Sequence, residues 1–408
     1  MAVAAIDANH RDDIAVNIHS QTYEAERHAP GLESAISSNW GIIVAVALAV
    51  PGTVAAQTGA DQGGPLIAFK WLSYKDQQPG LRRIAVESPS VRLRLPLEDK
   101  WSIDAQITSD RVSGASPRWH SSVSSASVMS DERRAFDVSV TRYEDGKEWK
   151  VGMASSKEND FLSRAVSAQK LWHSDDRNRS WSLGVAFTRD RIGSSDDASL
   201  DERRSTFEIS AGLTQAVSAK DLVQIGVTVA DGRGFYSDPY KRIDIRPSTR
   251  RQIIATTRWN HHVESLALTV RTSWRGYHDS FGVRSHTIGV EPIIAIGTRT
   301  SITPSLRLYS QTAAKFYFDP VYSFVGAPFP PGYFESPMRT ASADHRLAAF
   351  GAVTLGLKVT RQLGNGWVAD VRADHYEQRH GWSLGSAGSP GLAPLYARFY
   401  QLGLARQF

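Results

Sequence analysis

The sequence predicts an all-β protein, a single transmembrane up-and-down antiparallel β-barrel of about sixteen strands. Three observations predict it: many segments alternate apolar and polar residues, the connections separate into a short and a long set, and tryptophans gather near the short set. The 408-residue chain has no cysteine and no apolar run long enough for a membrane-spanning helix. Its negative mean hydropathy suits a membrane barrel, because half of each strand faces a polar interior.

The amino-terminal part resembles a secretory leader. Gly41–Val50 is an apolar run that Pro51–Gly52 breaks, and the small residues of Val54–Ala56 form a cleavage site. We therefore expect residues 41–56 to be a signal-peptide core and cleavage site. The alternative is a buried helix of a soluble domain.

The segments on either side of this run are less regular. Residues 1–40 lack a sustained period and the short basic stretch that should open a leader, so we expect them to be disordered or a mis-assigned start. Residues 57–65 would form a periplasmic amino-terminal segment, and residues 66–408 the barrel.

The strands are predicted from a period of two. Residues 181–188 read Trp-Ser-Leu-Gly-Val-Ala-Phe-Thr, and residues 223–229 read Val-Gln-Ile-Gly-Val-Thr-Val. An even strand number allows a single chain to close into a barrel with no free edge. The predicted strands are 66–75, 81–95, 100–109, 134–143, 147–156, 161–173, 178–189, 204–217, 221–231, 249–261, 264–277, 282–296, 299–311, 345–361, 366–378 and 395–408.

The connections segregate by length. The long ones are residues 110–133, 190–203, 232–248, 312–344 and 379–394, and all of them are odd-numbered along the chain. With a periplasmic amino terminus, odd connections are extracellular and even ones are periplasmic turns. Short turns on one side and long loops on the other are typical of outer-membrane barrels, whereas a soluble β-sandwich, the alternative fold, has no reason for such segregation.

Tryptophans mark the predicted periplasmic rim. Amphipathic rings at the headgroup level form belts around membrane proteins, whereas tryptophans in a soluble core would favour strand centres. The predicted belt consists of Trp101, Trp149, Trp172, Trp181, Trp259 and Trp367.

The chain ends in a strand with one apolar face. Residues 396–408 place Tyr400, Leu402, Leu404 and Phe408 on that face, and the sequence stops on the aromatic residue. Such a strand resembles the closing strand of bacterial outer-membrane barrels, in which the final Phe is an assembly signal. We therefore expect the barrel-assembly machinery and outer-membrane lipid among the partners.

Several segments resemble one bacterial family. They are Tyr74–Ile84, Trp101–Asp104, Asp110–Pro117, Tyr376–Arg379 and Gly388–Pro394. They are similar to the signature segments of the domain of unknown function 3570 (DUF3570) family, over about residue 66 to the end. The resemblance implies an outer-membrane barrel without an established activity or catalytic positions. Family members tend to be encoded near flavin-transfer and thioredoxin-like proteins, which implies an envelope redox partner.

Charged residues on the inward phases suggest a role for the lumen, because rings of fixed charge bias which ions enter a pore. The cations outnumber the acids, so an open pore would have a weak anion preference. In the competing interpretation the charges pair across the lumen and close it, with the aromatic-rich loop 312–344 as a plug. The cations are Arg92, Arg94, Lys150, Arg258, Arg271, Arg275, Arg307, Lys358 and Arg372, and the acids are Asp104, Asp137, Glu208, Glu291, Asp370 and Asp374.

Other chemistry is weakly indicated. Ser113, Ser116 and His120 could suggest a barrel lipase, but the Ser-Gly-Ala-Ser-Pro string is more simply explained as a turn. Asp370 and Asp374 flank Arg372, which indicates a charge network rather than acid–base catalysis. His261–His262 lacks a carboxylate at ligand spacing, so no metal is predicted. The cations are scattered singly, which argues against nucleic-acid binding despite a net charge of +5.

The sequence thus favours a porin-like channel for small solutes with no enzymatic activity and no cofactor. The alternative is a non-conducting barrel that docks an envelope partner through its loops. A barrel hydrolase is the third hypothesis.

Overall fold

The computed structural model describes residues 64–116, 127–241, 244–319 and 339–408. The predicted signal segment, the residues before it and most of the predicted periplasmic segment lie outside the described residues. The described helices are three short 3-10 turns: η1 (Glu264–Leu266), η2 (His345–Leu347) and η3 (His380–Trp382). Among the described residues, no helix is both long enough and apolar enough to cross a membrane.

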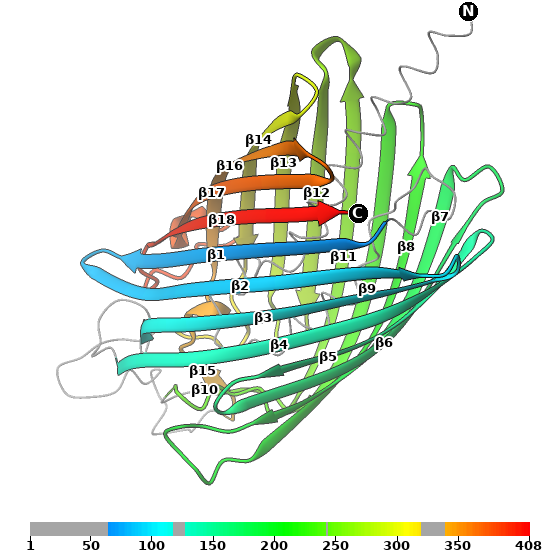
Figure 1. Ribbon diagram of the computed structural model, residues 1–408. Coiled ribbons are helices and arrows are strands. Elements are labelled where there is room, and N and C mark those ends of the chain that lie inside the picture. The colour runs from blue at the N-terminus through cyan, green and yellow to red at the C-terminus, as the bar shows by residue number, and fades with distance from the viewer. Residues whose placement is uncertain (1–63, 117–126, 242–243, 320–338) are drawn as a thin grey trace, which may run out of the picture.

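Sixteen antiparallel strands form one closed barrel, as the alternation predicted (Figure 1). Each pairs with its neighbours along the chain, and β1 closes the ring on β18 from Leu66↔Gln407 to Gln77↔Tyr396. The barrel strands are β1 (Leu66–Gln78), β2 (Leu81–Leu97), β3 (Trp101–Ser116), β4 (Ser127–Glu144), β5 (Lys147–Lys157), β6 (Phe161–His173), β7 (Arg179–Ile192), β8 (Glu202–Ala216), β9 (Asp221–Gly234), β11 (Thr249–Val263), β12 (Leu268–Asp279), β13 (Arg284–Ile296), β14 (Thr300–Gln311), β16 (Phe350–Gly364), β17 (Trp367–Arg379) and β18 (Leu395–Gln407).

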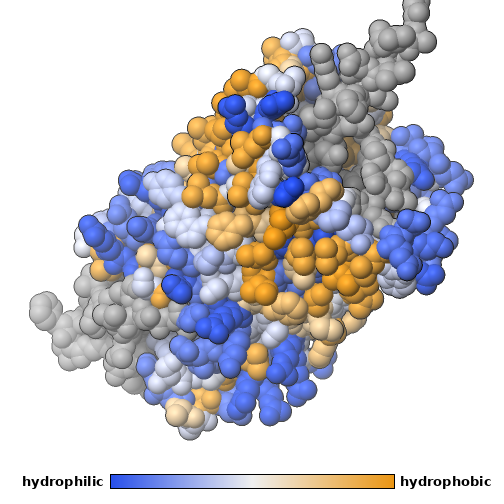
Figure 2. Space-filling view, viewed as in Figure 1, coloured by the Kyte–Doolittle hydropathy of each residue, from blue (hydrophilic) through white to orange (hydrophobic). Residues whose placement is uncertain are grey.

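The alternation places apolar side chains outside and polar ones inside. Along β7, Ser182, Thr188 and Asp190 are buried toward the lumen, whereas Leu183 and Phe187 are exposed on the outer wall. Figure 2 shows apolar side chains gathered in a band across one face of the wall, between more hydrophilic ends. A soluble sandwich would bury these side chains, so the structure excludes that alternative.

The two ends of the barrel differ. At one end, here called the short-turn end, consecutive strands are joined by residues 98–100, 145–146, 174–178, 217–220, 264–267, 297–299 and 365–366. Asn365 and Gly366 both have positive φ (52° and 76°), as a two-residue type I′ hairpin requires. The opposite end, the long-connection end, carries every longer connection.

The predicted boundaries were wrong at several places, and the strand predicted from residue 264 begins at Leu268, after η1. Residues 110–133, predicted as a loop, largely extend β3 and β4, whose register continues from Asp110↔Arg133 to Ser116↔Ser127. The strand predicted from residue 345 begins at Phe350, because the Asp344 side chain accepts from the Arg346 N–H and caps η2. Two two-residue strands, β10 (Asp244–Ile245) and β15 (Ala341–Ser342), pair inside segments predicted to be loops.

A charged substitution should destabilise the protein on the outer wall but not on the lumenal face. Val227 and Thr228 are neighbours on β9, with Val227 exposed outside and Thr228 on the lumen phase. We expect Val227→Arg to lower the free energy of unfolding in bilayers by about 2–4 kcal/mol, because it places a cation in the hydrocarbon. Thr228→Arg is the matched control. Chemical denaturation of refolded protein measures both, and equal losses would contradict this assignment of faces.

Candidate functional site

The charged residues that the sequence predicts to face inward all lie on the inner wall of the barrel. Each lies on the same phase as buried polar neighbours, such as Gln106 and Ser139 near Asp104 and Asp137. Lys150 is exposed to the lumen, whereas Arg271, Lys358 and Asp370 are buried against the wall. The remaining lumenal positions are those of Arg92, Arg94, Arg258, Arg275, Arg307, Glu208, Glu291, Arg372 and Asp374.

The strand register explains how these charges pair. The ion pairs named below join residues of one strand or of two adjacent strands, and none of these named pairs bridges opposite walls. The pairs among the predicted lumenal residues are Arg92–Asp104 at 2.5 Å, Arg94–Asp104 at 3.2 Å, Arg271–Glu291 at 3.4 Å and Arg372–Asp374 at 2.8 Å.

Sequence reasoning missed further lumenal pairs near the long-connection end. The sequence predicts that Asp110 and Asp190 lie in loops, but the period of two continues through both positions. Their partners lie on the adjacent strands, as do those of a third pair. These pairs are Arg133–Asp110 at 2.5 Å, Arg204–Asp190 at 2.7 Å and Arg250–Asp279 at 2.6 Å.

The six predicted belt tryptophans lie on outward phases near the short-turn end. Trp172 and Trp181 face each other across β6 and β7, with ring centroids 6.1 Å apart. Lys170 lies over Trp149 with its Nζ 4.6 Å from the ring centroid. Cations also lie over Trp101, Trp181 and Trp367, and Trp259 donates from Nε1 to Asp221 at 2.8 Å.

The apolar face of the terminal strand points outward. Tyr400, Leu402 and Leu404 are exposed on β18, and Phe408 follows it with the Arg406 guanidinium 4.4 Å from its ring centroid. The Phe408 N–H donates to the Pro65 carbonyl at 2.9 Å. The last residue is thus joined to the start of the barrel.

The structure adds little support for the catalytic and metal-binding candidates. Ser113 is exposed on β3, the Ser116 side chain and His120 lie outside the described side chains, and Asp374 accepts from Arg372. His261 does have a carboxylate partner, contrary to the sequence-based expectation: its Nδ1 lies 2.8 Å from Asp221 Oδ1. One carboxylate and one imidazole are too few for a structural metal site.

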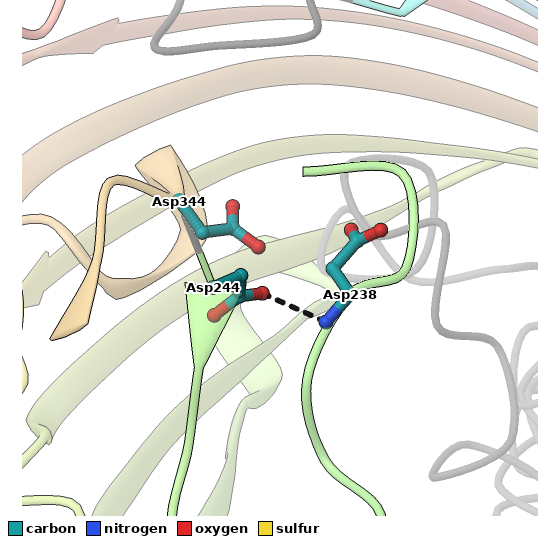
Figure 3. Close-up of side chains that lie close together, drawn as sticks. All are labelled: Asp238, Asp244 and Asp344. Atoms are coloured by element: carbon teal, nitrogen blue, oxygen red, sulfur yellow. Dashed lines mark hydrogen bonds between the residues drawn. The ribbon is translucent and has the colours of Figure 1, made fainter. Parts of the chain in front are cut away.

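A buried charge cluster lies inside the long-connection end. Asp238 and Asp244 come from the β9–β11 connection and Asp344 from the β14–β16 connection, so β10 and β15 bring the two connections together (Figure 3). Asp344 Oδ2 accepts from Arg246 Nη2 at 2.6 Å and from Arg346 Nε at 2.6 Å.

Hydrogen bonds complete this cluster. The Asp238 N–H donates to Asp244 Oδ2 at 2.8 Å, and Arg346 also pairs with Asp238. Lys241 Nζ lies 4.0 Å from Asp344 Oδ1. Three acids therefore meet three cations, which are Lys241, Arg246 and Arg346.

The electrostatics follow from burial and proximity. Burial alone would raise the pKa of Asp344, but Arg346, Lys241 and Arg246 hold it well below its ordinary value. Burial and the nearby Lys241 lower the pKa of His345, so the imidazole is neutral. Three carboxylates within reach of one another could suggest a cation site. The fit is poor, because three side-chain cations already balance their charge.

The cluster is fixed to the inner wall. Gln311, at the end of β14, donates from Nε2 to the carbonyls of Arg346 at 3.0 Å and Ala348 at 2.6 Å. Leu347 packs with Phe281 and Tyr236. Phe316 and Tyr317, which belong to the predicted plug loop, pack beside them, whereas residues 320–338 lie outside the described residues.

A second arm of the same network crosses between connections. Tyr240 donates its hydroxyl proton to Asp160 in the β5–β6 connection, and it accepts from the Ser195 N–H at 2.8 Å in the β7–β8 connection. The connection from β9 therefore contacts both. Tyr240 thus links the described parts of three connections at the long-connection end.

The comparisons with solved structures give a distant likeness. A siderophore receptor, PirA, from Pseudomonas aeruginosa has 10% identity and a TM-score of 0.44, with 83% of this chain and 61% of that chain covered. A bacterial polysaccharide outer membrane secretin has 8% identity and a TM-score of 0.46, with 85% and 99% covered. CdiB from Acinetobacter baumannii has 7% identity and a TM-score of 0.46, with 83% and 60% covered. The chain thus spans about three-fifths of the length of PirA and CdiB.

No curated protein has a sequence that matches this chain. A family model does match, over residues 122–403, and its description is "Protein of unknown function (DUF3570)". The match contains Tyr376–Arg379 and Gly388–Pro394, and it begins after the other segments that resemble the family. With most of its barrel inside the match, the chain belongs to the DUF3570 family.

Proposed function

We propose that this protein is an outer-membrane channel for small solutes, with a weakly cationic lumen as its selective element. One observation carries the proposal: the described ion pairs of the lumen run along the wall between adjacent strands. Charges that pair along a wall leave the axis available for water and solute, whereas pairing across the lumen would close it. Fixed wall charges then select by sign.

The orientation follows the asymmetry of the ends. The short-turn end, with its tryptophans and the chain terminus, faces the periplasm, and the long connections face outward. The outward apolar face of β18, formed by Tyr400, Leu402 and Leu404, then serves as a recognition signal for the assembly machinery. The outer wall contacts lipid.

The buried cluster is the constriction of this channel. Arg246, Arg346 and Asp344 tie the β9–β11 connection to the β14–β16 connection inside the lumen. Their release would widen the passage without opening the barrel, because no barrel hydrogen bond depends on them.

The second candidate is a non-conducting barrel that docks an envelope partner, including a redox partner. A pocket of about 610 Å³ in the β17–β18 connection favours it. Arg379, His380 and Trp382 line one side and Pro390–Pro394 the other. We propose that the protein has no enzymatic activity.

Conductance separates the two candidates. Refolded protein in a planar bilayer should carry a steady current, with a reversal potential displaced toward the anion in a salt gradient. Arg307→Glu with Lys358→Glu should move the reversal potential toward the cation, because both residues face the lumen. Arg251→Glu, on the outer wall, is the control. An electrically silent bilayer would favour docking.

Breaking the cluster should widen the channel. Arg346→Met leaves Asp238 and Asp344 without their shared cation, at a cost of about 3–5 kcal/mol to the folded connections. We expect higher single-channel conductance and unchanged barrel content by circular dichroism. Arg251→Met, an exposed arginine on the outer wall, controls for charge. Unchanged conductance in Arg346→Met would refute the constriction.

Acid should loosen the same contact. His345 has a lowered pKa in the folded protein, so its stabilising effect is complete above the ordinary pKa of about 6.5 and declines as pH falls. Asp344 acts in the same direction at still lower pH. We expect conductance to rise between about pH 7 and pH 5, and His345→Gln to reduce that rise. The groups facing His345 are Arg83, Lys241, Asp344 and Arg346. A rise that His345→Gln leaves unaltered would exclude this residue as its source.

A further inference from the structure

The outer wall carries a belt of cations just beyond the apolar band at the long-connection end. Nearly every strand from β18 through β1 to β13 contributes an Arg or Lys on its outward phase. Their exposure to the surroundings is high, with 80% of the Arg251 side chain exposed. The members are Lys75, Arg82, Arg111, Arg134, Lys157, Arg164, Arg189, Arg191, Arg203, Arg233, Arg251, Arg284 and Arg398, and we call them the outer cation belt.

The strand register sets many of these cations directly opposite one another. Facing residues on adjacent antiparallel strands have Cβ atoms about 4.5–5.5 Å apart, and like charges in such pairs are destabilising. An anion that bridges such a pair would remove the repulsion and stabilise the folded wall. The facing pairs are Lys75↔Arg398, Arg134↔Lys157, Arg164↔Arg189 and Arg191↔Arg203.

Acidic side chains of the protein lie beside two of these four facing pairs, and Asp231 lies between the belt members Arg233 and Arg251. Arg134 has Glu132 at 3.1 Å, and Arg191 has Asp201 at 2.7 Å. Within the described ranges, Lys75 and Arg398 have no acidic partner. The same is true of Arg164 and Arg189, which face each other on β6 and β7.

The short-turn end provides an internal comparison. There the register sets outward cations opposite tryptophans, and the ring faces stabilise the charge. The facing pairs are Trp101↔Arg142, Trp149↔Lys170 and Trp367↔Arg406. Cation–cation facing is therefore a property of the long-connection end.

We propose that the outer cation belt binds the phosphomonoester headgroups of lipids in the leaflet beside the long connections. A phosphomonoester carries about −1.5 to −2 charges at neutral pH, so one group neutralises two facing cations, whereas a phosphodiester neutralises one. Arginine also binds phosphate oxygens through two parallel hydrogen bonds. The lipid chains then lie on the adjacent apolar band. The inference rests on the proposed membrane location, but not on conduction.

The Arg164–Arg189 pair allows a sharp test. The full chain is refolded in zwitterionic micelles and titrated with lipid A, which carries two phosphomonoesters, or with phosphatidylglycerol. We expect lipid A to raise the unfolding midpoint of the wild type more than phosphatidylglycerol does. Arg164→Gln with Arg189→Gln should weaken lipid A binding about thirty-fold, given the contribution of each surface cation near an anionic leaflet.

The same double variant should unfold at higher denaturant than wild type when no anionic lipid is present, because the repulsion is removed. The two arginines should therefore lower the stability of the protein without lipid A and raise it when lipid A is bound. Loss of packing alone cannot produce this change of sign. Lys147→Gln with Arg361→Gln, exposed on the outer wall at the short-turn end, should leave both measurements unchanged. Equal stabilisation by both lipids, or equal lipid A binding in both double variants, would overturn the proposal. The conductance of the Arg164→Gln and Arg189→Gln double variant should match that of the wild type, so the lipid test does not depend on the channel.

Discussion

The structure depends on one constraint, which is that no strand edge remains unpaired in a wall that faces hydrocarbon. An unsatisfied peptide group there costs several kcal/mol, so a strand is tolerated only if both of its edges are hydrogen-bonded. The twelve-pair register between β1 and β18 meets this condition at the point where the first and last barrel strands meet. Closure also fixes the phase of every strand, since a one-residue slip would reverse its apolar and polar faces. The lumenal charges and the outer apolar band are therefore two results of the same pairing.

That coupling explains how much of the fold could be predicted from the sequence. Where outer residues are apolar and inner ones polar, as in residues 181–188, the alternation predicts both strand and face. Beyond the hydrocarbon the constraint ends, and the outward positions become polar too. For this reason the sequence predicts a loop at the ends of β3 and β4, although Arg111 faces out and Asp110 faces in as the period requires. The Asp110–Arg133 pair holds that extension together, and a partner on an adjacent strand cannot be read from one segment.

The charge cluster lay beyond prediction for a different reason. Asp244 and Asp344 are a hundred residues apart, and the two-residue strands that join them are too short to show a period. Asp238, Lys241 and Arg246 read as an ordinary polar connection. Only the barrel brings the two connections together, because closure sets the β9–β11 and β14–β16 connections around a common mouth. The Tyr-x-Asp spacing of Tyr277 and Asp279, whose side chains bond at 2.8 Å, was the kind of local signal that could have indicated a polar inner wall.

The chemistry of the cluster also bears on what it does. Buried ion pairs are a poor source of stability, because desolvation offsets most of their attraction, and apolar residues of the same size would hold two loops at least as firmly. Their value lies in specificity: Asp344 accepts from Arg246 and Arg346 in one geometry, and a shifted loop would leave charges buried and unpaired. The barrel wall provides the rigid frame against which such a contact can be all-or-none. A contact between two connections that paired charges form has one defined arrangement, and protonation of its acids would remove the pairing, a response that an apolar contact lacks. The placement of His345, buried beside Asp344 and Lys241, follows the same logic, because its neutral form is the only one that this arrangement accommodates.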